Sequence, residues 1–107
     1  MKKVLLSISF LALISCGSSI ADESNAKEAA RAAILNKLTS PSSAKFHHNE
    51  VVKKIDDSTF NYTETIESTN SFGGMIAQNA IVKVKWISGD ASEVTNWSVL
   101  DIQFAER

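Results

Sequence analysis

The period of the apolar residues changes at Pro41, the only proline of the chain, and this change constrains the fold more than any other feature. Before Pro41, Ala30, Ile34 and Leu38 recur every fourth residue in the alanine-rich segment 25–38, which predicts an amphipathic helix. After it, apolar and polar residues alternate, which is typical of strands. We therefore expect an α+β fold in which one N-terminal helix packs on a sheet.

Four segments carry the strand pattern, and turn residues join them in pairs. These segments are 49–55, 59–67, 80–87 and 94–104. The turn signals at 56–58 and 88–92 favour two hairpins. In the last segment Leu100 shares a face with Phe104, and Val99 lies on the opposite face, so both faces are apolar. That pattern favours a central strand, or one that the helix covers. The sequence predicts a four-stranded antiparallel sheet made of two hairpins.

The stretch 68–79 joins the two hairpins and shows no regular pattern. Gly73 and Gly74 give it backbone freedom, so we expect an irregular loop. We expect three of its apolar side chains to turn inward: Phe72, Met75 and Ile76. Successive N–H groups beside a glycine pair can bind an anion, but no lysine and serine of the phosphate-loop type follow. A structural corner is therefore the simpler interpretation.

Residues 1–15 have the pattern of an export signal. Two lysines precede an apolar run of about 11 residues, which is shorter than the roughly 20 that cross a bilayer. The run ends in Leu13-Ile14-Ser15-Cys16, which resembles the bacterial lipobox. The resemblance implies that the Cys16 thiol is joined to diacylglycerol and becomes the N-terminus. Gly17 is not the aspartate that retains enterobacterial lipoproteins in the inner membrane, so the resemblance implies the outer membrane, facing the periplasm.

A second cleavage site competes with Cys16. Ser19-Ile20-Ala21 has the small residues of an ordinary signal-peptidase site, and cleavage after Ala21 would release a soluble periplasmic protein. Cys16 is the only cysteine, so the exported chain has no internal disulfide to form. Acylation would remove that free thiol. With cleavage at Cys16, we expect a signal peptide at 1–15, a lipidated tether at 16–23 and a single domain at 24–107.

Charge limits the partners of the exported chain. Without the two lysines of the signal, nine basic residues face twelve acidic ones. Such a chain has no basic patch for nucleic acid and no polybasic segment for anionic lipid. Attachment to the membrane would therefore depend on the lipid on Cys16. The other partner that we expect is an envelope protein, and the sequence leaves the oligomeric state open.

Candidate catalytic and metal-ligating residues are few. His47 and His48 lie near Glu50, but adjacent residues of an extended chain point to opposite faces, and no third ligand follows at a zinc-like spacing. Serine, histidine and aspartate occur without a nucleophile elbow. Acidic residues are scattered over turns and polar strand faces. We therefore expect no enzyme, no metal and no other cofactor.

Two motifs together resemble a family of small bacterial and prophage-encoded proteins. They are Ser-Pro-Ser-Ser-Ala-Lys-Phe at 40–46 and Asn-Ser-Phe-Gly-Gly-Met at 70–75. Many members of this family look like lipoproteins, and they share a helix, these two motifs and a closing β region. The resemblance covers about residues 38–104. It supports the fold and implies no catalytic role.

These observations favour a non-enzymatic cell-envelope lipoprotein that binds another protein. By analogy with small prophage lipoproteins, phage superinfection exclusion or inhibition of an envelope enzyme would be a sharper form of this hypothesis. The alternatives are a structural or assembly lipoprotein of the outer membrane and a soluble periplasmic binding module cleaved after Ala21. The candidate interaction residues are Phe72, Gly73, Gly74 and Trp97, although burial in the core is the simpler interpretation of Trp97.

Overall fold

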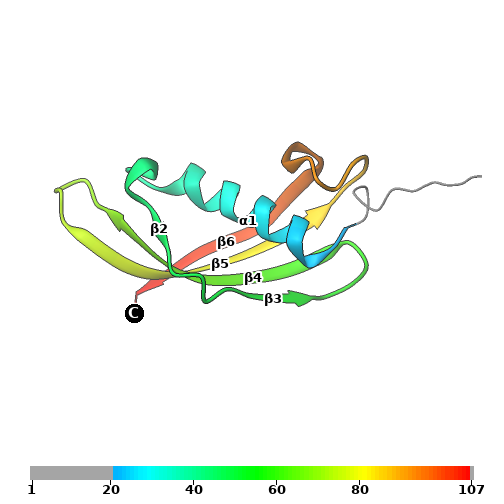
Figure 1. The fold of residues 1–107 in the computed structure, drawn as a ribbon, viewed down its shortest axis with the longest axis horizontal. Coiled ribbons are helices and arrows are strands. Elements are labelled where there is room, and N and C mark those ends of the chain that lie inside the picture. Colours follow the sequence, from blue (N-terminus) through cyan, green and yellow to red (C-terminus); the bar gives the residue numbers. More distant parts are fainter. Residues whose placement is uncertain (1–20, 107) are drawn as a thin grey trace, which may run out of the picture.

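The computed structural model describes residues 21–106 and shows one helix lying along one face of an antiparallel sheet (Figure 1). The helix is α1 (Glu23–Lys37), and the strands are β2 (Lys45–Phe46), β3 (Val51–Lys54), β4 (Thr59–Thr69), β5 (Met75–Trp86) and β6 (Trp97–Glu106). Two short 3-10 turns, Pro41–Ser43 and Val94–Asn96, precede β2 and β6. The predicted α+β architecture is confirmed. Among the described residues, no helix is long and apolar enough to cross a membrane.

The long strands β4 and β5 form the middle of the sheet. Their pairing runs without interruption from Thr59 opposite Lys85 to Thr69 opposite Met75. β6 pairs with the other side of β5, while β3 and β2 share the other side of β4. Both predicted hairpins are therefore present, and a third, longer hairpin joins them. The fifth strand, β2, was not predicted, because two residues are too few to show a period.

The prediction of an irregular loop over 68–79 was wrong. Both strands of the β4–β5 hairpin continue into this stretch, and the turn itself is limited to residues 70–74. The three apolar side chains that we expected to turn inward are exposed, with exposed fractions of 95% for Phe72, 52% for Met75 and 37% for Ile76. No layer covers this end of the hairpin closely enough to bury them.

The last strand lies at the edge of the sheet and α1 covers one of its faces, so of the two predicted alternatives the helix-covered strand is confirmed and the central strand is not. Its pairing with β5 shifts by one residue, because Lys83 faces Asp101 and Val84 faces Val99. Leu100 is thereby left over as a β-bulge, and this extra residue reverses the alternation. Trp97, Val99, Ile102 and Phe104 consequently share the face that α1 covers. The sequence therefore showed apolar residues on both faces of a regular strand because the alternation reverses at the bulge.

The helix packs on the sheet through small side chains. Ala26, Ala29, Ala30 and Ile34 of α1 are buried, and alanine allows the helix to approach the strands closely. The helix begins two residues before the predicted segment 25–38, because the carboxylate of Asp22 caps it by accepting a hydrogen bond from the amide of Asn25 at 2.8 Å. Below the helix the core consists mainly of Phe60, Tyr62, Ile66, Val82, Val84 and Trp97. The centroids of the Phe60 and Trp97 rings lie 5.8 Å apart.

The packed domain begins earlier than the predicted boundary at residue 24. Ala21 is 8% exposed and belongs to the core, and Asp22 caps the helix. The predicted signal peptide and Cys16 lie outside the described residues. Within the described residues, every core residue falls between Ala21 and Phe104, so a chain that begins at Gly17 contains all of them.

Candidate functional site

A buried ionic cluster links the middle of the helix to the sheet. Alternation along β4 turns Tyr62 and Glu64 toward α1, where Arg31 reaches them. The Arg31 Nε donates to Glu64 Oε1 at 3.0 Å and to the Tyr62 hydroxyl at 3.1 Å, and Nη2 donates to Glu64 Oε2 at 2.8 Å. The Tyr62 hydroxyl in turn donates to Glu64 Oε1. The Glu64 side chain is completely buried, so this two-pronged arginine contact neutralises a charge that water does not reach.

The segment between β2 and β3 closes this cluster from the side. The His48 amide donates to Glu64 Oε2 at 2.8 Å, and His48 adopts a left-handed conformation with φ of 59°. Glu50 lies between two cations, with Oε2 2.9 Å from Lys27 Nζ and Oε1 3.6 Å from Arg31 Nη2. Phe46 of β2 lies under the Arg31 guanidinium, 4.5 Å from its central carbon. The cluster thus joins α1, β2, β4 and the segment between β2 and β3.

The pKa shifts agree with a cluster that holds its charges in place. Burial alone would lower the pKa of Arg31, but the hydrogen bonds to Glu64 and Tyr62 outweigh it and raise that pKa above its ordinary value. Burial, followed by the bond to Glu64, raises the pKa of the Tyr62 phenol. The hydrogen bond from Lys27 lowers the pKa of Glu50. The two cations, Lys27 and Arg31, therefore balance the two carboxylates, Glu50 and Glu64.

Three possible metal ligands meet in the same place. Donor atoms of His48, Glu50 and Glu64 lie within 4.8 Å of one another. The Nη2 of Arg31 lies among them, 3.5 Å from His48 Nδ1 and 2.8 Å from Glu64, and so takes the central position that a cation would need. His47 points elsewhere and contacts Glu67 at 2.7 Å. The geometry favours a structural ion cluster, and the absence of a metal stays a prediction.

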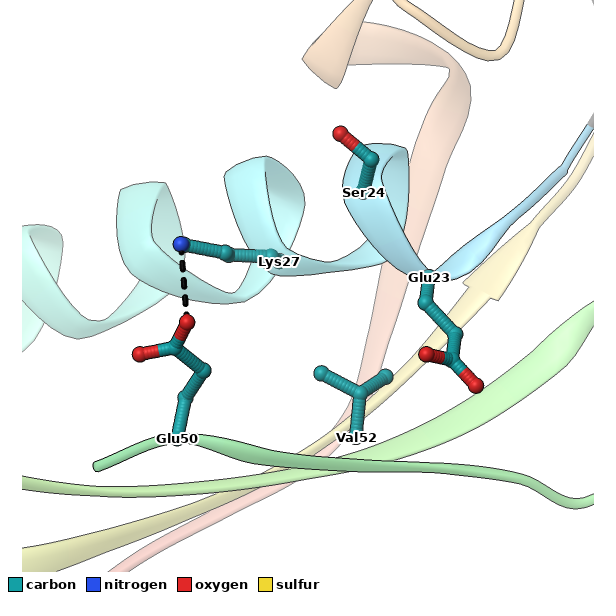
Figure 2. Close-up of a pocket in the computed structure, with 5 residues that line it drawn as sticks. All are labelled: Glu23, Ser24, Lys27, Glu50 and Val52. Carbon is teal, nitrogen blue, oxygen red and sulfur yellow. Dashed lines mark hydrogen bonds and ion pairs between the residues drawn. The ribbon is translucent and has the colours of Figure 1, made fainter. Parts of the chain in front are cut away.

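A surface recess of about 310 Å³ lies beside the cluster, between the start of α1 and β3. Figure 2 shows Lys27 reaching down to Glu50 in this recess, with Val52 on the strand below and Ser24 pointing away. Glu23 completes the lining. Lys27 donates to Glu50 Oε2, whereas the buried Glu50 Oε1 has no hydrogen-bond partner and only the ion pair with Arg31 at 3.6 Å. The lining offers no hydroxyl or thiol beside a base that could activate it. The recess therefore gives no support to catalysis.

The second candidate is the end of the β4–β5 hairpin, residues 68–77, which we call the distal hairpin. Asn70 organises its turn: the Oδ1 atom accepts hydrogen bonds from the amides of Phe72, at 2.9 Å, and Gly74, at 3.0 Å. Backbone bonds link Asn70 to Gly73 and Gly74 as well. Gly73 has a φ of 86°, which favours glycine. The turn therefore holds the exposed Phe72 in a defined position.

The distal hairpin projects beyond the rest of the sheet. β2 covers the edge of β4 only as far as Glu67, and β6 covers β5 only from Gln78. Figure 1 shows this hairpin at the left, at the opposite end of the domain from the start of α1. From residue 68 to residue 82 the chain has no charged side chain, although 21% of its residues are charged. An uncharged projection with an aromatic residue at its tip is typical of a surface that becomes buried in a complex.

The structure brings together three of the four candidate interaction residues. Phe72, Gly73 and Gly74 form the tip of the distal hairpin. Trp97 belongs to the core: it is 9% exposed, and its ring nitrogen donates to the carbonyl of Ala91 at 2.7 Å. The core interpretation of Trp97 is therefore the one that the structure supports.

Our sequence interpretation missed the cluster around Arg31 and Glu64. The sequence did contain one indication of it. Glu64 lies on the same face of the strand as Phe60, Tyr62 and Ile66, so it interrupts an apolar strand face. A charge in such a position predicts a buried ion pair.

The comparisons with known proteins add no further information. No protein-family model, no curated protein and no solved structure matches this chain. Function is therefore inferred from the residues described above.

Proposed function

We propose that this chain is a lipid-anchored protein of the bacterial envelope, without enzymatic activity, that binds another protein through its distal hairpin. The observation that carries the proposal is the exposed Phe72, held by Asn70 at the tip of an uncharged projection. The Asn70 bonds fix the backbone at the tip, and a backbone already fixed in position loses little conformational entropy on binding. Interface centres are rich in aromatic residues and poor in charged ones, as this tip is.

The start of the domain supports cleavage at Cys16. Cleavage after Ala21 would remove a residue that is buried in the core. It would also place a positively charged amino group on Asp22, beside the positive end of the helix dipole. Cleavage at Cys16 leaves both features intact, which favours the lipid-anchored form over the soluble periplasmic one.

The anchor and the binding surface would then lie at opposite ends of the domain. Cys16 precedes Ala21 by five residues, which span at most about 18 Å when fully extended. The start of α1 would therefore stay close to the membrane. The eleven residues of β4 extend about 35 Å toward the distal hairpin. The proposed surface thus faces away from the lipid, toward proteins of the same compartment.

Two experiments test this proposal. Mass spectrometry of the mature N-terminus is expected to find acylated Cys16, and a free Asp22 would overturn the lipid anchor. In the second, a photoreactive phenylalanine analogue replaces Phe72 in the cells that make the protein, with Val51, which is 64% exposed, as the matched control position. We expect a covalent complex from position 72 and none from position 51.

The absence of any complex at position 72 would contradict binding through the distal hairpin. The identity of a captured protein distinguishes the sharper hypotheses. A phage receptor would indicate superinfection exclusion, and an envelope enzyme would indicate inhibition. A complex with a component of outer-membrane assembly would favour the structural alternative.

A further inference from the structure

We infer that the protein bound by the distal hairpin is a second copy of this chain, paired through the free edge of β5. This inference rests on the proposed function, because it assigns the occupant of the same surface. Residues Met75–Ala77 of the two copies would form an antiparallel pair about a two-fold axis, with Ile76 facing Ile76 of the second copy. Phe72 of each copy would enter a hollow on the other.

The free edge of β5 is the first observation. On its outer side β5 pairs with β6 only from Gln78, which faces Glu106, so in the described part of the chain Met75–Ala77 has no strand there. In an antiparallel ladder alternate residues direct both their N–H and C=O groups to the same neighbour. The edge over Met75–Ala77 therefore offers backbone donors and acceptors to an added strand.

The other edges are less suited to pairing. The bulge at Leu100 distorts the outer edge of β6, and the exposed Asp101 follows it. On the other side of the sheet, β3 is four residues long and carries exposed Lys53 and Lys54. Bulges, short edge strands and lysines all discourage edge pairing. Among the described strands, the distal part of β5 has none of these protections.

Charge indicates a second copy as the occupant. A two-fold axis brings each residue near the same residue of the other copy, so a charged side chain close to the axis would meet its like charge. Like charges that face each other across paired strands are destabilising. The fifteen residues from 68 to 82 contain no charge, so two such segments meet without this repulsion. The two-fold also imposes the antiparallel direction that every strand pair of this sheet already has.

A hollow lies where Phe72 of the second copy would arrive. It has a volume of about 200 Å³ and is lined by Ile76, Ala77, Gln78 and Glu106, at the point where β6 ends. In a register centred on Ile76, the strand pair ends at Ala77, because Glu106 of β6 already occupies the outer side of Gln78. The turn of the second copy therefore comes to lie against the end of β6. Phe72 is 95% exposed, and an aromatic side chain can bury roughly 150–250 Å². So small a contact predicts weak, concentration-dependent association.

The test uses the chain from Gly17 onward, which contains the whole core and no cysteine. Ile76→Cys then introduces the only thiol, at the centre of the proposed pair. Directly facing residues of antiparallel strands have Cα atoms about 4.5–5.5 Å apart, within the range that a disulfide spans. Under mild oxidation we expect Ile76→Cys to form covalent dimers at least tenfold faster than the matched control, Val51→Cys.

Two further variants test the role of Phe72 and the register. Adding Phe72→Ser to Ile76→Cys should slow dimer formation about tenfold or more, because each copy loses an aromatic anchor. A mixture of Met75→Cys and Ala77→Cys chains should cross-link faster than either alone, since these residues face each other in this register. The mixture also replaces Ile76→Cys if that variant does not fold, as judged by circular dichroism.

Equal cross-linking rates for Ile76→Cys and Val51→Cys, or no effect of Phe72→Ser, would overturn the inference. Photo-crosslinking at position 72 separates this failure from failure of the proposed function. If position 72 captures a different protein while the cysteine pairs do not form, the second copy is wrong and the proposed function stands. If position 72 captures nothing, both are wrong.

Discussion

Replacing Arg31 with methionine should expose the energetic cost of the buried Glu64 carboxylate. Methionine keeps an unbranched apolar stem but removes the guanidinium, so Glu64 loses its hydrogen bonds at 3.0 and 2.8 Å. Only the Tyr62 hydroxyl and the His48 amide remain as partners. Because the Glu64 side chain has no exposed surface, water cannot replace the missing cation unless the structure opens.

Removing one partner of a buried ion pair typically costs about 3–5 kcal/mol, because the other charge is left buried without compensation. We therefore expect Arg31→Met to destabilise the domain by about 3–5 kcal/mol at pH 7.

Urea unfolding of the chain from Gly17 at pH 7 measures this loss. Trp97 is buried against Phe60, so its fluorescence reports on the core. With a urea dependence of about 1 kcal/mol/M for a small domain, the midpoint should fall by about 3 M or more. The matched control is Lys27→Met, which removes a partner from the less buried Glu50 and should cost less than Arg31→Met.

The double variant Arg31→Met/Glu64→Leu completes this test. It replaces the buried charges with apolar groups, so it should recover most of the stability that Arg31→Met loses. A loss for Arg31→Met no larger than that for Lys27→Met, or no recovery in the double variant, would refute an uncompensated carboxylate as the cause.

Three further predictions use the same unfolding measurement. Gly73→Ala should cost about 1 kcal/mol because φ is 86°, whereas Gly74→Ala has room for its methyl group and should cost little; equal losses would contradict this. Asp22→Ala should cost about 1 kcal/mol, because Asp22 is the N-cap of α1, and an unchanged midpoint would argue against that cap. Folding raises the pKa of Tyr62, so this group stabilises the fold fully at pH values below the ordinary tyrosine pKa of about 10. This stability is lost as the pH rises above about 10, because the phenol then ionises in the unfolded chain. Tyr62→Phe should weaken that alkaline loss, and a loss of unchanged size would count against this origin.

The helix and the hairpins could be predicted because burial on one face leaves a period in the sequence. The alternation in 59–67 correctly indicated a strand with one face in the core. The bulge in β6 could not be predicted in this way. One extra residue, Leu100, changes which neighbours share a face, and the alternating pattern does not show where the extra residue lies.

The distal hairpin was missed for a related physical reason. A strand alternates in polarity only where its two faces meet different surroundings. At the end of β5, Met75, Ile76 and Ala77 are all exposed, so no difference between faces selects apolar from polar residues. The pairing with β4 still holds these residues in a strand. An apolar run without alternation is therefore compatible with a projecting strand as well as with a loop.

The ionic cluster was missed because its partners come together only through the tertiary fold. Arg31 lies outside the apolar positions of the helix, and its side chain is long enough to reach the sheet from there. Glu64 lies 33 residues further along the chain. Its position on the apolar face of the strand indicates burial, but nothing local in the sequence identifies the cation that faces it.

The cluster and the distal hairpin are connected through the base of the hairpin. On the side of β4 away from β5, the short strands β2 and β3 pair with only part of β4. Side chains of the segment between α1 and β3 supply further hydrogen bonds to β4 there. Asn49 bonds both the amide and the hydroxyl of Thr65, and Ser43 Oγ accepts from the amide of Thr69 at 2.9 Å. The cluster fixes the same segment through the His48 amide. These contacts brace the last residues of β4 just before the turn, so the tip keeps its direction relative to the helix. The proposed binding surface would depend on this rigidity, because affinity is higher when Phe72 is presented in one position.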